Sequence, residues 1–278
     1  MIRKLLEDHI KNNVPDSEVA VLLSGGVDSI SVALAAQDAG KNIISYTFHL
    51  KDKPSYDALK AKEVSDKMGW ECHTVKVPTE NLISDWYKLV EHGCRKKTHF
   101  ECVFPFLYVY PEIQEKYVLT GWAADGYFGP SKKAMMRYSS YKKKRNYVKY
   151  CQDHNQKRLN WNEFRIAYLD GDCAGYQQHT KLAENHKKKH ITPYKDPKVR
   201  EYLMGMSWKE LNKPRQKEPV RADFPELEEF GRIKQHQNLH LNAGVDKLFS
   251  QLIDNPEINF NKRERMMDFC RDHFYKST

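Results

Sequence analysis

The sequence has no long hydrophobic run. No stretch of about 18 apolar residues, the minimum for a membrane-spanning helix, occurs in its 278 residues. Residues 1–16 mix charged and apolar side chains, without the continuous apolar segment of a secretory signal. We therefore predict a cytoplasmic protein that does not associate with membranes.

Paired cysteines are also missing. The chain has six cysteines and no C-x-x-C pair, and no ligand spacing supports a zinc site. Without a secretory signal, a disulfide framework is not expected in a chain of this length. We predict that the thiols are reduced.

Negative charge is in deficit, internal repeats are absent, and no low-complexity linker occurs. The net charge is +9, whereas 40% of the residues are hydrophobic and 12% aromatic. This composition excludes general disorder, because it provides enough apolar surface for a core. The positive charge indicates either an anionic ligand, such as a nucleotide, pyrophosphate or nucleic acid, or a solvated lysine-rich surface.

The first half of the chain alternates short apolar runs with helical patterns. A helix with an apolar face is expected before the first run, and strands then alternate with helices: strands at 18–23, 42–50, 72–77 and 116–120, and helices at 28–39, 56–68 and 81–90. This order predicts an α/β fold with a doubly wound parallel sheet. Ligands of such sheets bind at the carboxyl ends of the strands.

The second half differs in composition. It is rich in Lys, Tyr, His and Asn, contains basic clusters at 142–145 and 187–189, and is interrupted by several prolines. We predict two regions: an α/β core over residues 1–130, and a mostly helical, basic region over residues 131–278 that packs on it and faces the substrate.

A glycine turn follows the first strand and opens the next helix, with the sequence Ser24-Gly25-Gly26-Val27-Asp28-Ser29. Gly25 and Gly26 allow a tight turn and close approach of a ligand. The free amides of a helix N-terminus suit phosphate, and the hydroxyls of Ser24 and Ser29 add donors. Asp28 fits beside phosphates if a divalent cation is shared with them. The alternative is a structural turn in which Asp28 and Ser29 cap the helix.

The turn resembles the S-G-G-x-D-S pyrophosphate loop of the N-type ATP pyrophosphatases, and no Walker A string is present. The resemblance implies a Rossmann-like fold of the adenine nucleotide α-hydrolase type and cleavage of ATP to AMP and pyrophosphate. It also implies the residues that bind ATP and pyrophosphate: Leu22, Ser24, Gly25, Gly26, Val27, Asp28, Ser29, Thr47 and Gly121.

A second segment, Leu119-Thr-Gly-Trp-Ala-Ala-Asp-Gly-Tyr-Phe-Gly129, resembles a loop in the synthetase domains of asparagine synthetase and β-lactam synthetase. The match implies that Asp125 and Asp28 hold Mg²⁺ together. Two carboxylates at neighbouring strand ends suit that role. The alternative is a polar turn with Asp125 as a helix cap.

Two further segments resemble the same synthetases: Pro193-Tyr-Lys-Asp196, which matches a turn before a helix, and Lys217-Glu-Pro-Val-Arg221. The second match implies that Lys217 is the catalytic lysine, stabilising charge as the pyrophosphate leaves. Arg221 would orient nearby acidic groups. The alternatives are that Lys217 is an ordinary surface lysine, or that Lys213 takes its role.

The chain departs from these relatives in two ways. Only a short predicted helix precedes the first strand, where asparagine synthetase has its glutaminase domain. Glutamine hydrolysis is therefore not expected, and the nitrogen source would be free ammonia, another amine or a separate ammonia-supplying subunit. Trp122 stands where the family has a glutamate that deprotonates the attacking amine, which tryptophan cannot do. Trp122 would instead pack in the core or form a stacking wall for a ring.

Three functional hypotheses follow. The first is an amide-forming ligase that uses ATP and Mg²⁺ to adenylate a small-molecule acid, which an amine then attacks. The second is a modifying enzyme for a nucleotide or nucleic acid, in which the basic clusters and the tyrosines between residues 138 and 150 bind the acceptor. The third is a degenerate ATP-binding protein, which the retained charged residues argue against.

Overall fold

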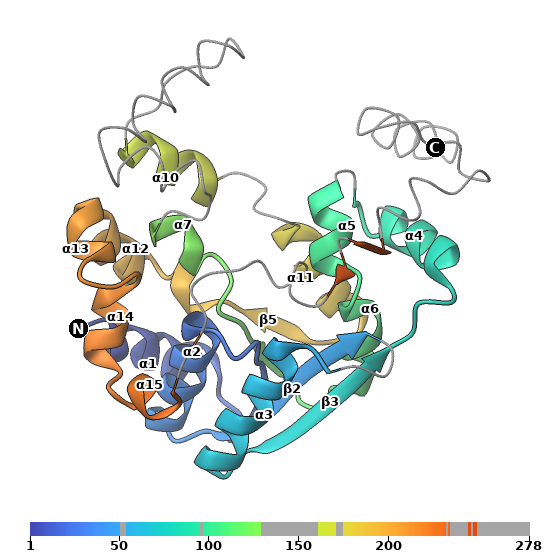
Figure 1. The fold of residues 1–278 in the computed structure, drawn as a ribbon, viewed down its shortest axis with the longest axis horizontal. Coiled ribbons are helices and arrows are strands. Elements are labelled where there is room, and N and C mark those ends of the chain that lie inside the picture. Colours follow the sequence, from blue (N-terminus) through green and yellow to red (C-terminus); the bar gives the residue numbers. More distant parts are fainter. Residues whose placement is uncertain are drawn as a thin grey trace.

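The computed structural model describes residues 1–50, 54–94, 97–128, 161–170, 175–231, 233, 244–245 and 247–248. Its centre is a parallel sheet of five strands in the order β3-β2-β1-β4-β5 (Figure 1). The strands are β1 (Glu18–Leu22), β2 (Asn42–Leu50), β3 (Glu71–Val77), β4 (Tyr117–Leu119) and β5 (Lys189–Ile191). Because all five run in the same direction, their carboxyl ends share one edge of the sheet.

Helices connect the strands and cover the sheet. In the first half they are α1 (Ile2–Asn13), α2 (Val27–Asp38), α3 (Tyr56–Met68), α4 (Leu82–Glu91), α5 (Lys97–Val103), α6 (Phe106–Val109) and α7 (Ala124–Phe128), with the 3₁₀ turn η1 (Tyr110–Glu112). In the second half they are α10 (Trp161–Leu169), α11 (Tyr176–Asn185), α12 (Pro197–Met204), α13 (Trp208–Asn212), α14 (Glu218–Asp223) and α15 (Glu226–Glu229), with the 3₁₀ turn η2 (Pro193–Lys195).

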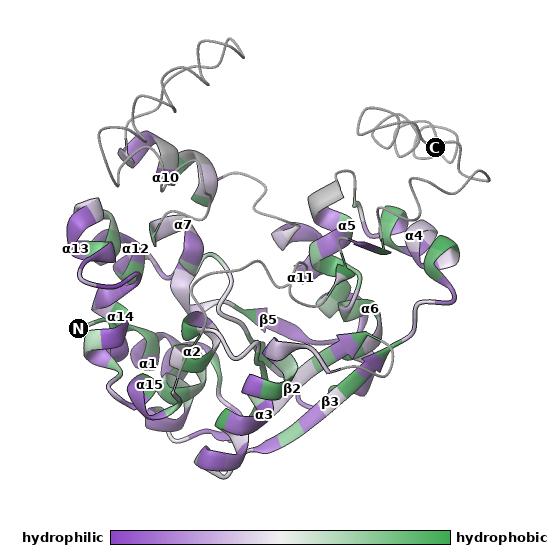
Figure 2. Ribbon diagram, in the orientation of Figure 1, coloured by the Kyte–Doolittle hydropathy of each residue, from purple (hydrophilic) through white to green (hydrophobic). Residues whose placement is uncertain are grey.

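The two faces of the sheet pack into separate apolar clusters. One includes residues of α1, α2, α3, α12 and α14, and the other includes residues of α4, α5, α6 and α11. The last four residues of β1 are buried, as expected for a central strand that is covered on both faces. β3, at the edge of the sheet, carries hydrophilic colours among its apolar residues (Figure 2).

The expected fold class and the strands and helices expected in the first half are confirmed, with ends shifted by at most one residue; helices α5, α6 and α7 were not expected. The second strand and its following helix have the predicted bounds, and Gly69 ends that helix in the left-handed conformation (φ 70°). The sequence analysis did not identify β5, because three residues beginning in a lysine run are too short for a periodic pattern. The boundary at residue 130 stays a prediction.

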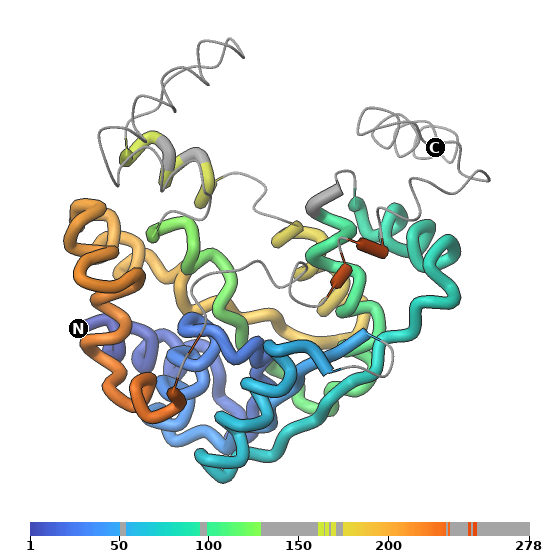
Figure 3. Tube along the Cα trace, viewed as in Figure 1, coloured from blue at the N-terminus to red at the C-terminus, as the bar shows by residue number. Residues whose placement is uncertain are grey.

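The chain returns to its beginning after β5. Helices α12 and α14 contact α1, so segments 200 residues apart lie side by side (Figure 3). The amino group of Met1 pairs with Asp223, and Arg3 pairs with Glu226 at 2.8 Å. These contacts bring the 213–223 segment beside α2 and the turn that precedes it. In the described ranges, no helix has both the length and the apolar character required to span a bilayer.

Candidate functional site

The predicted pyrophosphate loop lies at the carboxyl end of β1 and is held in shape by hydrogen bonds of Ser24 and Ser29. Ser29 Oγ accepts from the Ser24 amide at 3.1 Å, lies 3.0 Å from Ser24 Oγ and donates to the Gly26 carbonyl at 3.1 Å. Gly26 precedes α2 and has no side chain to cap it. The helix N-terminus therefore keeps the capacity to bind an anion.

Gly25 allows helix α3 to pack tightly on this loop. It has φ 67°, and a Cβ atom there would lie 2.7 Å from Lys60 Cβ and Cγ and 3.0 Å from the Ala61 amide nitrogen. The sequence analysis did not identify Lys60, whose ammonium is buried and binds Glu63 (2.6 Å) and the Phe230 carbonyl (2.9 Å). Its contact with the loop depends on the docking of α3, which no local pattern predicts.

Three charged residues from distant parts of the chain meet beside the loop. Lys217 Nζ lies 2.5 Å from Asp28 Oδ2 and 2.8 Å from Asp125 Oδ1. Asp28 belongs to the first turn of α2, Asp125 to the first turn of α7, and Lys217 precedes α14. The structure thus brings together the two predicted metal ligands and the predicted catalytic lysine.

Lys217 is an enclosed ammonium, 5% exposed. Burial by itself lowers its pKa, but the carboxylates of Asp125 and Asp28 outweigh that effect and raise the pKa above the usual value. The side chain therefore stays charged at neutral pH. Lys217 also has a left-handed backbone (φ 63°), as does Ala123 (φ 70°) just before α7. Such conformations in non-glycine residues are often concentrated at functional sites.

Lys213, the alternative lysine, is not part of this cluster. Its ammonium lies 6.0 Å from the centre of the Trp208 ring. Arg221 does not reach the two aspartates in the structure either. Its Nε donates to the Gln216 carbonyl at 3.2 Å, and its Nη1 lies 3.6 Å from Glu228. Arg221 therefore supports the residue that precedes Lys217.

Gly121 is the point of closest approach between the two predicted loops. A Cβ atom at this position would lie 2.7 Å from the carbonyl carbon of Asp28 and 2.8 Å from the Ser29 amide nitrogen. The neighbours are backbone atoms, which cannot rotate away. A residue without a side chain is therefore required for Asp125 to sit beside Asp28.

We expect Gly121→Ala to separate the loops of Asp28 and Asp125. The added methyl group overpacks a backbone contact, so the free energy of unfolding should fall by about 1–3 kcal/mol, measured by urea denaturation. Gly205→Ala is the control, because there the nearest atom would lie 3.5 Å away. Equal stabilities for the two variants would contradict the close contact.

The Pro193–Asp196 segment contacts α2 through a hydrogen bond between Tyr194 and Ser31. The hydroxyl of Tyr194, fully buried, lies 2.8 Å from Ser31 Oγ, which donates to the Asp28 carbonyl at 3.0 Å. Asp196 Oδ1 caps α12 by accepting from the amides of residues 198 (2.7 Å) and 199 (3.3 Å). The segment is thus a turn before a helix. Through Ser31, Tyr194 connects this turn to the backbone carbonyl of Asp28.

The remaining predicted nucleotide-binding residues are Leu22, Val27 and Thr47. Leu22 ends β1, and Val27 is the buried first residue of α2. Thr47 is a buried residue of β2 that follows Tyr46, whose carbonyl accepts from the Leu23 amide at 2.8 Å. These positions flank the carboxyl end of β1, beside the loop.

Trp122 packs among aromatic side chains. Its ring lies 4.7 Å from that of His179 and 6.3 Å from that of Tyr176, between centroids. The side chain is partly buried against the cluster on the α5–α6 side of the sheet. These contacts agree with the first of the two predicted roles for Trp122, packing in the core.

The basic cluster at 187–189 lies at the amino ends of the strands, opposite the end of the sheet where the loop lies. Lys189 begins β5 and pairs with Tyr117, which begins β4, whereas the loop follows the end of β1. The cluster at 142–145 and the tyrosines between 138 and 150 fall outside the described residues. Of the two basic clusters, the one that can be placed does not face the loop.

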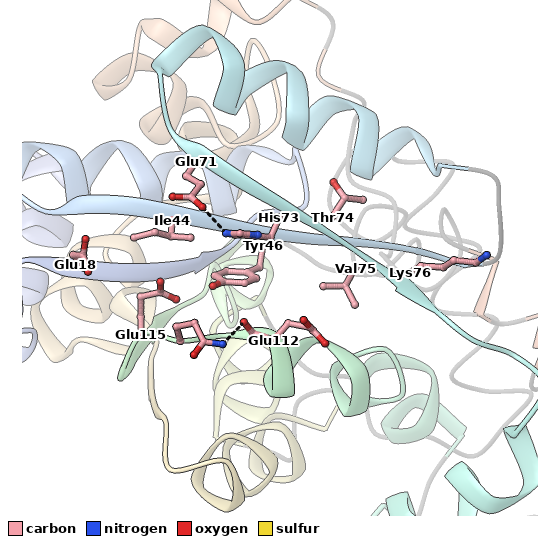
Figure 4. Close-up of a pocket in the computed structure, with 11 residues that line it drawn as sticks. Glu18, Ile44, Tyr46, Glu71, His73, Thr74, Val75, Lys76, Glu112 and Glu115 are labelled. Atoms are coloured by element: carbon pink, nitrogen blue, oxygen red, sulfur yellow. Dashed lines mark hydrogen bonds and ion pairs between the residues drawn. The ribbon is translucent and has the colours of Figure 1, made fainter.

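A groove of about 660 Å³ lies toward the same amino-terminal edge (Figure 4). Tyr46 and His73 stack there with centroids 5.0 Å apart, and His73 pairs with Glu71 at 2.9 Å. Glu18 and Glu71, which begin their strands, line it together with Glu115. This acidic groove shares none of its lining residues with the loop or with the Lys217 cluster.

The donor set of the cluster fits a magnesium ion. Asp28 and Asp125 already converge on one cationic atom, and carboxylate oxygens are the ligands that Mg²⁺ prefers. Within the described part of the chain, no group of three or more His, Cys, Asp or Glu residues could form a complete metal cage. Two carboxylates with phosphates and water completing the shell is the usual arrangement for Mg²⁺.

Comparison with known proteins identifies a family for this chain. The profile of the family described as asparagine synthase matches residues 1–224. A search of curated proteins finds no match. Similar solved structures include a predicted subunit of tRNA methyltransferase from Methanocaldococcus jannaschii, with 16% identity, coverage of 68% of this chain and 76% of that chain, and a TM-score of 0.33. NMN synthetase from Francisella tularensis has 14% identity, coverage of 90% and 92%, and a TM-score of 0.29. With the family profile spanning most of its length, the chain belongs to the asparagine synthase family of ATP-dependent synthetases.

Proposed function

We propose that this protein is an amide-forming ligase that activates a small-molecule carboxylate with ATP and transfers the acyl group to an amine. The observation that carries the proposal is the convergence of Lys217, Asp28 and Asp125 beside the Ser24–Ser29 loop. In this reaction a carboxylate oxygen attacks the α-phosphorus, and the bond to the oxygen that bridges the α- and β-phosphates breaks. The amine then attacks the acyl carbon, AMP leaves, and the amine loses a proton.

The residues of the site suit the first step. The loop hydroxyls and the N-terminus of α2 would bind the pyrophosphate, and Asp28 and Asp125 would hold Mg²⁺, which supplies positive charge to the phosphates. The enclosed Lys217 ammonium would stabilise charge that develops as pyrophosphate leaves, and its burial keeps that interaction strong. For deprotonation of the amine, Trp122 offers no base.

Modification of a nucleic acid has less support. Binding of a polyanion near the loop needs basic residues at that end of the sheet. Of the two basic clusters, Lys187–Lys189 lies at the other end, and the cluster at 142–145 falls outside the described residues. A small acid and a small amine therefore remain the proposed substrates, with ammonia from solution or from a separate subunit as one source of nitrogen.

The proposal is tested by product analysis. Purified protein is incubated with ATP, Mg²⁺ and pools of amino acids, other carboxylic acids or nucleotides, and mass spectrometry identifies the products. AMP and pyrophosphate that form only with a carboxylate pool, and that disappear in Asp28→Ala, support the ligase. ADP and phosphate would contradict cleavage between the α- and β-phosphates, and dependence on the nucleotide pool would favour the alternative acceptor.

We expect Arg221→Met to lower the rate by about ten- to a hundredfold, because a small displacement of the 216–217 backbone moves the Lys217 ammonium. Arg215→Met is the matched control: Arg215 also pairs with Glu228 (2.6 Å) but is more exposed. The initial rate of pyrophosphate release checks this, together with the free energy of unfolding. Equal losses in both variants would assign Arg221 no positioning role.

A further inference from the structure

We propose that Lys217 is the internal counter-ion of the metal site: its ammonium excludes a divalent cation from Asp28 and Asp125 until ATP draws the ammonium away. The inference rests on the proposed function, since it takes ATP as the ligand. It concerns the order in which this site binds its ligands.

The first step of the argument is charge. Two carboxylates that face one another in a partly enclosed space repel unless a cation lies between them. Here that cation is part of the chain, with Nζ 2.5 Å from Asp28 Oδ2 and 2.8 Å from Asp125 Oδ1. Because Nζ contacts both carboxylates at hydrogen-bond distance, a divalent cation held by the same two carboxylates would have to compete with it.

The second step is geometry. An ammonium and a divalent cation beside the same two carboxylates repel one another, so these residues would hold the metal only if Lys217 withdraws. The side chain is 5% exposed, which leaves few places for the charge. Withdrawing it from both carboxylates without another anion to receive it would leave a buried ammonium unpaired, which is costly.

The third step concerns the anion that could receive the Lys217 ammonium when it leaves the two carboxylates. The Ser24–Ser29 loop, which contains Asp28, has the form of a phosphate site, so phosphates bound there would lie within reach of Lys217. The ammonium can then exchange carboxylates for phosphates without losing its ionic partners. Metal and nucleotide should therefore bind with strong positive coupling, and metal alone should bind weakly.

The experiment measures Mn²⁺ binding by electron paramagnetic resonance, without turnover. We expect the wild-type chain to bind Mn²⁺ at least tenfold more weakly than Lys217→Met when nucleotide is absent. Adding α,β-methylene ATP should raise the Mn²⁺ affinity of the wild type at least tenfold more than that of the variant. Lys213→Met is the control and should match the wild type, and Asp125→Asn combined with Lys217→Met should abolish the new site.

Equal Mn²⁺ affinities of wild type and Lys217→Met would overturn the proposal, and so would equal effects of the nucleotide on both. If Lys217→Met unfolds without metal, its refolding is titrated with Mn²⁺ by circular dichroism, because a ligand that binds only the native state stabilises it. Failure to refold at millimolar Mn²⁺ would also overturn it. Since no amide product is measured, these results are independent of whether the ligase activity is found.

Discussion

Replacing Lys217 with methionine should reduce the release of pyrophosphate by about a hundred- to a thousandfold, the range typical of removing one group that stabilises transition-state charge. The ammonium is the only described side-chain cation within hydrogen-bond distance of both Asp28 and Asp125, and methionine has a similar length without the charge. The initial rate of pyrophosphate release, with saturating ATP and Mg²⁺, measures the effect.

The control for this substitution is Lys213→Met, which removes a lysine four residues away whose ammonium lies over Trp208. We expect it to retain nearly full activity. Since the loss of one partner of a buried ion pair costs about 3–5 kcal/mol, the folded fraction of Lys217→Met must be measured by circular dichroism and the rate expressed per folded molecule. A rate within tenfold of the wild type would show that Lys217 does not stabilise the transition state.

Replacing Gly25 with alanine should lower the free energy of unfolding by about 2–4 kcal/mol, because strain and overpacking act together. The residue has φ 67°, and the added methyl group would lie 2.7 Å from Lys60 Cβ and Cγ on α3. Lys60 Cβ is fixed by its helix, so the loop must move instead. Urea denaturation measures the loss, and the same displacement should weaken ATP binding.

Gly40→Ala separates the two causes. Gly40 has a similar backbone conformation (φ 76°), but nothing lies within 4 Å of a Cβ atom there. This variant should therefore lose only the conformational part, about 1 kcal/mol, and should bind ATP normally. If the two variants are equally destabilised, the packing of α3 on the loop does not contribute.

The sequence by itself determined strands β1–β4, helices α1–α4 and the position of the loop. Strands such as Asn42–Leu50 and helices such as Tyr56–Met68 follow from apolar periodicity and from glycines at helix ends, which are local signals. The parallel order of the strands then placed the loop at the carboxyl edge of the sheet, because connections between such strands leave few alternatives.

Only the tertiary structure decided which side chains meet at that edge. Lys217 and Lys213 lie four positions apart, but the packing of α14 against α1 and α2 brings Lys217, and not Lys213, to Asp28 and Asp125. Likewise β5 joins the sheet through pairing with β4, Gly121 is required by the backbone of Asp28, and Tyr194 reaches Asp28 through Ser31. These contacts join residues roughly 70 to 190 positions apart, and periodicity and capping carry no information over such separations because they arise from neighbours within a turn or two of the chain.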